Sequence, residues 1–92
     1  MMKVRFRRQA EADLSGIVEW FEAVAPEAVA NILADIYRSI DQLIDFPRSG
    51  TKVPGQGFRR IVTHRYHFKI AYEIGDSTII VVGIFRFQNR DS

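Results

Sequence analysis

The chain has 92 residues, 47% of them hydrophobic and 12% aromatic, and this length predicts a single domain over residues 1–92. It contains no cysteine, which excludes disulfides, thiolate metal sites and cysteine nucleophiles. No stretch reaches the roughly 20 apolar residues needed to cross a bilayer, and residues 1–8 lack the apolar run of a signal peptide. We therefore expect a soluble, cytoplasmic protein with no membrane partner.

The formal net charge of +2 conceals a strong separation of charge along the chain. Residues 3–8 hold four cations and no anion, residues 10–46 hold one cation against eight carboxylates, and residues 47–92 hold eight cations against three carboxylates. Because the three segments correspond to different predicted elements, the folded molecule should have one acidic side and one basic side. Such a surface favours a charged macromolecular partner.

The first half of the chain predicts one strand and two helices. Residues 3–8 alternate charged and apolar side chains, which is the period of a half-buried strand. From Ala10 the apolar spacing becomes that of a helix, which ends near Ala25-Pro26. A second helix continues to Phe46-Pro47, and the short link predicts an antiparallel helical hairpin. The apolar face of the second helix consists of Val29, Ile32, Leu33, Ile36, Tyr37, Ile40, Leu43 and Ile44.

The second half predicts a loop followed by strands. Proline and glycine are frequent in Pro47–Gly57, which is typical of a loop. Aromatic and β-branched residues then dominate three segments, predicted as strands: Phe58–Val62, Tyr66–Ile74 and Thr78–Phe87. Gly75-Asp76-Ser77 predicts a tight hairpin turn between the last two. Tyr66 and Tyr72 share the apolar face of the middle strand, so we expect both in the core.

These elements predict an α+β fold of order β-α-α-β-β-β. An N-terminal strand precedes an antiparallel helical hairpin, which packs on a mainly antiparallel, twisted sheet. The last strand is apolar on both faces over residues 79–82, so we expect it at the centre of the sheet. Because the hairpin can cover only one side, the other side is a candidate partner surface.

An ordered set of short motifs spans nearly the whole chain. They are Ala12-Asp13-Leu14 with Ile17 and Trp20, Phe46-Pro47-Arg48-Ser49-Gly50, Val53-Pro54-Gly55 with Gly57, Arg59-Arg60, Tyr66, Tyr72 and Arg90-Asp91. In this set the chain resembles the RelE/ParE superfamily of bacterial toxins from type II toxin–antitoxin modules. The loop leading into Arg59-Arg60 is closer to the ParE branch than to the RelE branch.

The resemblance implies a small toxin held inactive by a cognate antitoxin, whose acidic or amphipathic C-terminal segment wraps around it. ParE-like members are associated with poisoning DNA gyrase. RelE-like members cleave mRNA on the ribosome without a metal. One fold therefore serves two chemistries, so the fold alone does not decide between them. No cofactor is implied.

A nuclease would need a proton-transfer group and cations around the phosphate. The candidates are His64 as proton shuttle with Arg59, Arg60 and Arg86. By ungapped placement, however, Phe87 occupies the position of a histidine frequent in RelE-type members, and phenylalanine cannot transfer a proton. His64-x-x-His67 lacks a convincing third ligand, so we expect no metal site. We therefore favour a toxin that is not an enzyme; if it is one, we expect a metal-independent endoribonuclease.

A toxin that acts by binding would use cations for encounter and apolar groups for affinity. The residues we expect to bind the target are Arg60, Arg86 and Arg90, and those we expect to bind the antitoxin are Trp20, Arg59, Lys69 and Phe85. Trp20 could instead anchor the helix in the core. Arg59 and Arg60 point to opposite faces of a strand, so one could pair with a helix carboxylate. We favour a ParE-like toxin that acts by binding a protein, DNA gyrase. The alternatives are an mRNA endonuclease and a non-toxic member that only binds its antitoxin.

Overall fold

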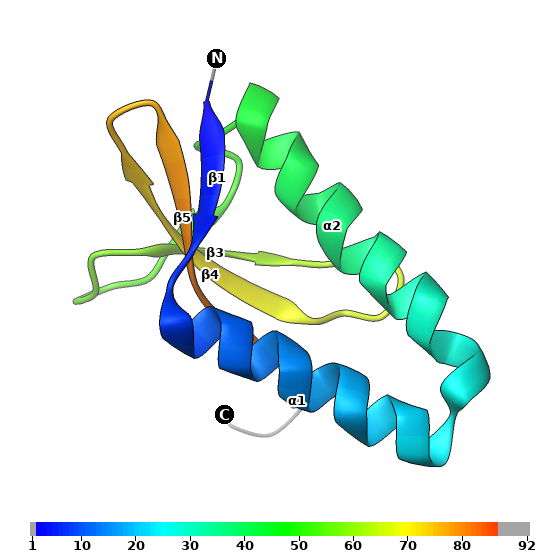
Figure 1. Cartoon of the computed structure of the whole chain (residues 1–92). Helices are drawn as coiled ribbons and strands as arrows, with labels where there is room; N and C mark the ends of the chain where they lie inside the picture. The colour runs from blue at the N-terminus through cyan, green and yellow to red at the C-terminus, as the bar shows by residue number, and fades with distance from the viewer. Residues whose placement is uncertain (1, 87–92) are drawn as a thin grey trace.

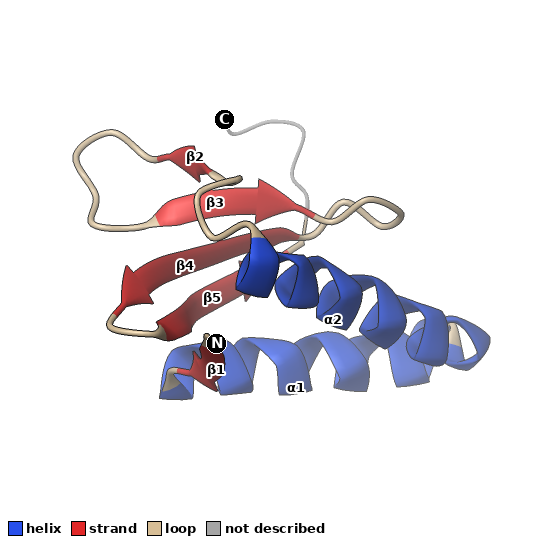
Figure 2. Ribbon diagram, turned by 90° about the horizontal axis from the view of Figure 1, so that it is seen from above, coloured by secondary structure: helices blue, strands red, loops and turns tan. Residues whose placement is uncertain are grey.

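The protein is described from a computed structural model, which defines the structure of residues 2–86. Its elements follow in the order β1 (Lys3–Phe6), α1 (Arg8–Val24), a 3₁₀ turn η1 (Pro26–Ala28), α2 (Val29–Asp45), β2 (Thr51–Lys52), β3 (Arg59–Val62), β4 (Lys69–Gly75) and β5 (Thr78–Phe85). The strands form one sheet in the order β1-β5-β4-β3-β2. β1 is parallel to β5 and the other neighbours are antiparallel (Figures 1 and 2). The predicted α+β fold is confirmed.

The two helices form a hairpin whose arms diverge from η1 (Figure 1). Proline fits the first turn of a helix, and Pro26 begins the 3₁₀ turn that reverses the chain between α1 and α2. At the far end, Pro47 disfavours helical geometry in Phe46, and α2 ends one residue before it at Asp45. The Phe46 N–H still bonds to the Gln42 carbonyl at 2.9 Å, which closes the last turn.

The main core lies between α2 and one face of the sheet. Ile32, Ile36 and Ile40 recur every four residues along α2, and all are almost fully buried. They pack with Ala10 and Ile17 of α1 and with Phe68, Ile70, Val81 and Ile84. α1 instead lies beside the second half of β5, next to where β1 has ended. We use the term outer face for the side of the sheet opposite α2.

An extra residue in β5 exchanges the faces of that strand halfway along it. Tyr72 pairs with Val81 while the preceding Ala71 pairs with Gly83, which leaves Val82 without a partner. This is the geometry of a β-bulge. Before the bulge, odd-numbered side chains of β5 such as Val81 point into the core. After the bulge, the even-numbered Ile84 points into the core, so Phe85 lies on the outer face. The last strand is an interior strand, flanked by β1 and β4, but the middle of the sheet is β4 and not β5 as predicted.

Asp35 of α2 fastens the turn between β3 and β4. Its carboxylate is only 3% exposed and accepts hydrogen bonds from the Arg65 N–H at 3.1 Å and the Tyr66 N–H at 2.8 Å. Burial by itself raises the pKa of this carboxyl. A hydrogen bond from the Thr63 hydroxyl, the two N–H groups and the charge of Arg38 outweigh burial and hold the pKa below its ordinary 3.8. The turn is therefore fixed by an ionised carboxylate.

Tyr72 fastens a second loop, the one that follows α2. The ring is fully buried, and its hydroxyl donates to the Pro47 carbonyl at 2.7 Å and accepts from the Gly50 N–H at 3.0 Å. A Cβ on Gly50 would lie 2.5 Å from that hydroxyl, so only glycine fits there. Arg59 completes the clamp by donating to the Gly50 carbonyl at 2.9 Å. The motif Phe46–Gly50 is thus held rigidly from the sheet.

Three predictions about the strands were wrong in detail. The segment predicted entirely as loop, Pro47–Gly57, contains β2, whose two residues pair with Arg59 and Arg60. The middle strand begins at Lys69 rather than Tyr66, because Asp35 holds the preceding residues in a turn and His67 takes a positive φ of 61°. Tyr66 is consequently half-buried, whereas Tyr72 is in the core as predicted. β5 ends at Phe85, and Phe87 lies outside the described residues.

No helix within residues 2–86 has the length and apolarity to cross a lipid bilayer.

The lowered pKa of Asp35 makes stability depend on pH in a defined direction. Because the folded pKa is below the unfolded one, the stabilisation is fully present above about pH 4 and is lost as pH falls through the folded value. We expect Asp35→Asn to reduce the free energy of unfolding by about 1–3 kcal/mol at pH 7, measured by urea unfolding. The difference from wild type should shrink below about pH 4.

Asp41→Asn, an exposed change on the same helix, is the matched control and should leave stability unchanged at both pH values. An Asp35→Asn deficit of equal size at pH 7 and at roughly pH 2 would show that the charge of the carboxylate is unimportant.

Candidate protein-interaction site

The outer face of the sheet is basic and open. Residues on it alternate with core residues of the same strands, and the register places them in shared rows. They are Lys3, Arg5, Arg60, Val62, Lys69, Glu73, Ile80 and Phe85. Four are cations and one is a carboxylate, whereas seven of the eight predicted acidic-segment carboxylates lie on α1 and α2. The predicted division into an acidic side and a basic side is therefore present in the fold.

The cations are not neutralised by the helices. Within residues 2–86 the one ion pair joins Arg7 to Glu73 at 2.8 Å, so both partners come from the sheet side of the molecule. The two helix aspartates nearest the sheet, Asp13 and Asp35, accept backbone N–H groups instead. The basic surface consequently keeps its charge for an external partner.

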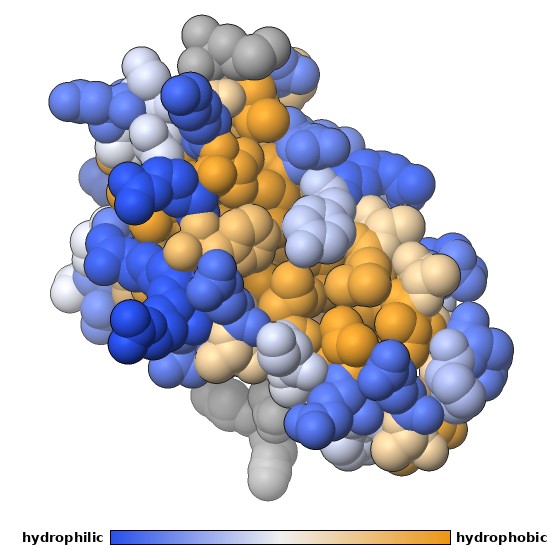
Figure 3. Space-filling model, viewed as in Figure 1, coloured by the Kyte–Doolittle hydropathy of each residue, from blue (hydrophilic) through white to orange (hydrophobic). Residues whose placement is uncertain are grey.

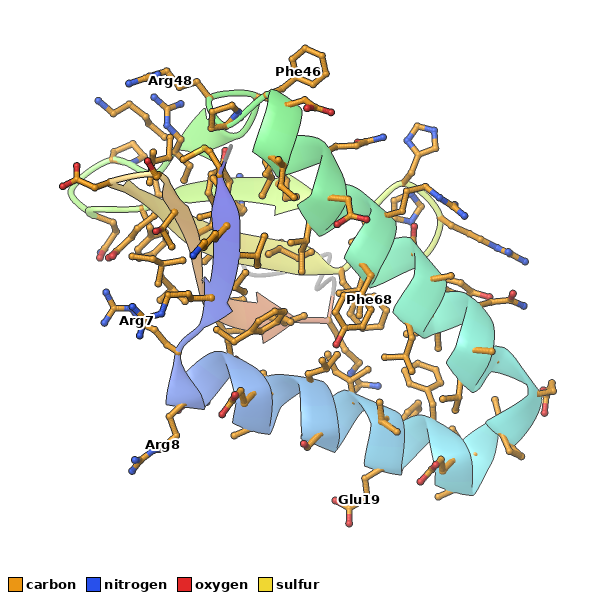
Figure 4. All side chains as sticks on the ribbon, turned by 45° about the horizontal axis from the view of Figure 1, so that its top comes forward. Arg7, Arg8, Glu19, Phe46, Arg48 and Phe68 are labelled. Atoms are coloured by element: carbon orange, nitrogen blue, oxygen red, sulfur yellow. The ribbon has the colours of Figure 1, made fainter. Side chains whose placement is uncertain are left out.

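A hollow of about 400 Å³ lies beside β1 within this basic surface. Arg5, Arg7 and Arg8 line it, with Phe6 and Ile80. Figure 4 shows Arg7 and Arg8 projecting away from the core on the β1 side of the molecule. Guanidinium groups around a partly apolar floor suit a segment that carries both carboxylates and aliphatic side chains.

Trp20 lies on the surface rather than in the core. Its side chain is 47% exposed, it packs edge-on to Phe21 with centroids 4.8 Å apart, and the Arg86 guanidinium lies 4.4 Å from its ring centroid. The helix is anchored instead by Ile17 and Phe21. Phe85, 51% exposed, lines the same hollow of about 500 Å³ as Trp20 and Arg86. The structure thus brings three of the predicted binding residues together.

Asp13 explains how α1 is placed beside this hollow. Beyond Val81, β5 has no strand neighbour on the β1 side, because β1 ends at Phe6. The Asp13 carboxylate accepts the Ile84 N–H there at 3.0 Å and also accepts from Gln9 at 2.8 Å. A helix side chain thereby protects an open strand edge. Sequence reasoning assigned Asp13 no role, and its motif with Ala12 and Leu14 was the available signal.

Arg59 and Arg60 take different positions, as their adjacency requires. Arg59 is opposite Tyr72 on the core side, where its guanidinium donates to the Gly50 carbonyl and, at 3.5 Å, to that of Arg48. It holds a loop through these carbonyl groups rather than pairing with a helix carboxylate, which was the possibility raised for one of the two arginines. Arg60 is exposed on the outer face, in the row of Ala71. Of the two, only Arg60 is placed to meet a partner.

The residues proposed for nuclease chemistry are not assembled. His64 is exposed in the turn after β3, at the same end of the sheet as Arg86, because Val62, Lys69 and Phe85 form one row. Arg60 lies two residues before Val62, which is roughly 7 Å farther along the strand. Arg90 falls outside the described residues. No group of three or more potential metal ligands occurs within residues 2–86.

The helix side of the molecule carries an apolar groove. It has a volume of about 510 Å³ and is lined by Leu14, Ser15, Val18, Glu19, Glu22, Leu33 and Tyr37. Figure 3 shows a continuous hydrophobic band between the diverging helices, with hydrophilic residues to the left of it on the β1 side. Two carboxylates at its rim distinguish this groove from the basic outer face. Sequence reasoning missed it because it requires the angle between the helices.

A family model described as the ParE toxin of the type II toxin–antitoxin system parDE matches residues 4–90. The chain belongs to the ParE toxin family. It is therefore a type II toxin–antitoxin toxin of the ParE/RelE group. No curated protein sequence matches it.

Solved structures show the same fold at low identity. A chain of a chromosomal ParDE system from P. aeruginosa superposes with a TM-score of 0.81 at 23% identity, covering 96% of this chain and 98% of that one. A chain of the intact E. coli RelBE toxin–antitoxin complex gives 0.65 at 11% identity, with 96% and 99% covered. A chain of the heterotetrameric YoeB–YefM complex from S. aureus gives 0.57 at 14% identity, with 96% and 98% covered.

The role of Asp13 in this ParE-family toxin can be tested directly. Asp13→Ala leaves the Ile84 N–H without its acceptor, so we expect a loss of about 1–3 kcal/mol in the free energy of unfolding by urea denaturation. Glu19→Ala, an exposed change on the same helix, should alter stability by less than about 0.5 kcal/mol. Equal stabilities for the two variants would mean that water replaces the carboxylate at no cost.

Proposed function

We propose that this toxin acts in the cytoplasm by binding DNA gyrase, and that a cognate antitoxin neutralises it. The observation that carries the proposal is the basic outer face, where Lys3, Arg5 and Arg60 form no ion pair with a helix carboxylate within residues 2–86. Charge of one sign on one surface accelerates and orients association with an acidic protein. Arg60, Arg86 and Arg90 are the residues we assign to the target.

The arrangement supports binding rather than cleavage. A metal-free nuclease needs its proton donor, its acceptor and its cations within hydrogen-bonding reach of one phosphate. Here Arg59 is engaged with the loop after α2, and Arg60 and His64 lie on different parts of β3 and its following turn. No observation on residues 2–86 favours the mRNA endonuclease or the non-toxic alternative over the gyrase inhibitor.

The toxin has two surfaces suited to binding the antitoxin. The groove between α1 and α2 would take the apolar side of an amphipathic segment, with basic flanks facing Glu19 and Glu22. The outer face and the hollow lined by Arg5, Arg7 and Arg8 would take an acidic stretch of the same chain, near Lys69 and Phe85. The solved relatives are toxin–antitoxin complexes, which supports this partner. Trp20 would contribute at the edge between these surfaces.

The gyrase proposal is tested by a supercoiling assay with purified DNA gyrase, run beside an in vitro translation reaction scored for mRNA cuts. We expect gyrase inhibition and intact message. Arg60→Glu should raise the concentration for half inhibition about tenfold, equivalent to about 1.4 kcal/mol, because it reverses a charge on the binding face.

Arg38→Glu is the matched control, since it changes the net charge equally but is exposed on α2, on the side of the sheet opposite the outer face. It should leave inhibition unchanged. Codon-position-dependent mRNA cleavage with fully active gyrase would replace the proposal with the endonuclease.

A further inference from the structure

The loop Phe46–Ser49 displays a large apolar side chain on a rigid support. Phe46 is 66% exposed, the highest value among the large hydrophobic side chains of residues 2–86. Figure 4 shows Phe46 and Arg48 projecting outward beyond the end of α2, whereas Phe68 points into the interior. Phe46, Pro47, Arg48 and Ser49 border a shallow hollow of about 380 Å³. A single exposed apolar residue is common on protein surfaces, so Phe46 indicates a binding site only if the loop that carries it is held in place.

That support is unusually complete for a surface loop. The buried Tyr72 hydroxyl holds Pro47 and Gly50 together, and the Ser49 N–H bonds to the Phe46 carbonyl at 3.1 Å. The Arg59 guanidinium bonds to the same loop from β3. Because the loop backbone is already ordered, binding would cost only the conformational freedom of the Phe46 and Arg48 side chains. Aromatic and arginine side chains are the typical dominant contributors to a protein interface.

The charge around the loop identifies the partner's chemistry. The loop is followed directly by β2, which begins at Thr51. Because β2 pairs with β3, Lys52 lies opposite Arg59 and Thr51 lies opposite Arg60. Arg48 and Lys52 form no ion pair within residues 2–86, and Lys52 lies on the same side of the sheet as Arg59, whose guanidinium holds the loop. The carboxylates near this cationic patch are Asp45, which precedes the loop in sequence, and Glu73, which lines a hollow with Lys52 and Arg59 and is paired with Arg7. An acidic surface complements this patch.

We propose that the Phe46–Ser49 loop is a contact element for the toxin's protein target. Phe46 enters an apolar recess on an acidic surface of that target, and Arg48 pairs with a carboxylate at the rim. This rests on the proposed function, because it takes the target to be a protein. The loop leads directly into β2, whose Thr51 pairs with Arg60, so the loop and this target-binding residue lie at the same edge of the sheet, although Arg60 points to the outer face. It shares no residue with the groove between α1 and α2 or with the hollow beside β1.

A nucleic acid fits this element less well. Single-stranded nucleic acid is held by successive aromatic side chains along a basic groove. Within residues 2–86 the other exposed aromatic side chains, Trp20, Tyr37 and Phe85, belong to α1, to α2 and to the end of β5. Among the residues that the structure describes, Phe46 therefore has no exposed aromatic neighbour with which to form a stack.

The test compares Phe46→Ala and Arg48→Ala with wild type in the supercoiling assay and in a growth-arrest assay after induced expression. We expect the concentration for half inhibition of gyrase to rise about tenfold or more for Phe46→Ala, with growth arrest relieved in parallel. Val24→Ala, which truncates a 56% exposed apolar residue at the end of α1, is the control and should behave as wild type. Thermal unfolding of each variant should be within a few degrees of wild type, because both changed side chains are exposed.

Tyr72→Phe provides an independent variant, since it removes the hydroxyl that clamps the loop and leaves Phe46 and Arg48 in place. We expect a smaller loss of inhibition than for Phe46→Ala, measured below the unfolding temperature of the variant. Inhibition by Phe46→Ala within twofold of wild type would overturn the inference while leaving the gyrase proposal intact.

The failure of the gyrase proposal is separately visible. If wild type arrests growth without inhibiting gyrase or cutting mRNA, relief of arrest by Phe46→Ala still supports a protein target for the loop, and unrelieved arrest overturns it. If wild type cuts mRNA, or if Arg48→Ala abolishes salt-dependent binding of a single-stranded RNA 20-mer, the loop serves RNA and the inference is wrong. A wild type that does not arrest growth overturns both proposals.

Discussion

The parallel pairing of β1 with β5 is the constraint on which the functional surface depends. It joins residues from the two ends of the chain, with Lys3 opposite Thr78 and Phe6 opposite Val81. Through it the cations of the N-terminal segment meet those of β3 and β4 on one sheet face, and Arg7 reaches Glu73. Without this pairing, the two basic segments would be separate patches, each with less influence on an approaching partner.

Buried and half-buried polar groups keep that face in position from the other side. Asp35 fixes the turn that precedes β4, Tyr72 fixes the loop after α2, and Asp13 occupies the open edge of β5. Each satisfies backbone groups that no strand or helix bonds, and leaving such groups unpaired in a buried place is unfavourable. The helix carboxylates at the sheet are therefore used for structure, and exposed arginines of the outer face such as Arg5 and Arg60 stay available for binding.

Several site features escaped prediction because they depend on geometry between elements. The spacing around Trp20 fits both a core anchor and an exposed residue, and the placement of α1 beside β5 decides for exposure. Alternation predicts the faces of β5 up to Val82, where the bulge reverses them and turns Phe85 outward. Arg59 was predicted to bind the antitoxin, yet its guanidinium donates a hydrogen bond to the Gly50 carbonyl of the loop after α2.

The sequence by itself determined the element order, the fold class and the separation of charge, because periodicity, proline positions and local composition express these within a few residues. It also determined the family, through motifs in their order along the chain. Only the tertiary structure decided which cations face outward, that the Phe46–Gly50 motif is clamped by a tyrosine from β4, and where apolar surface stays open. These properties arise from contacts between residues distant in sequence, and the pattern of a single segment carries no record of its neighbours in space.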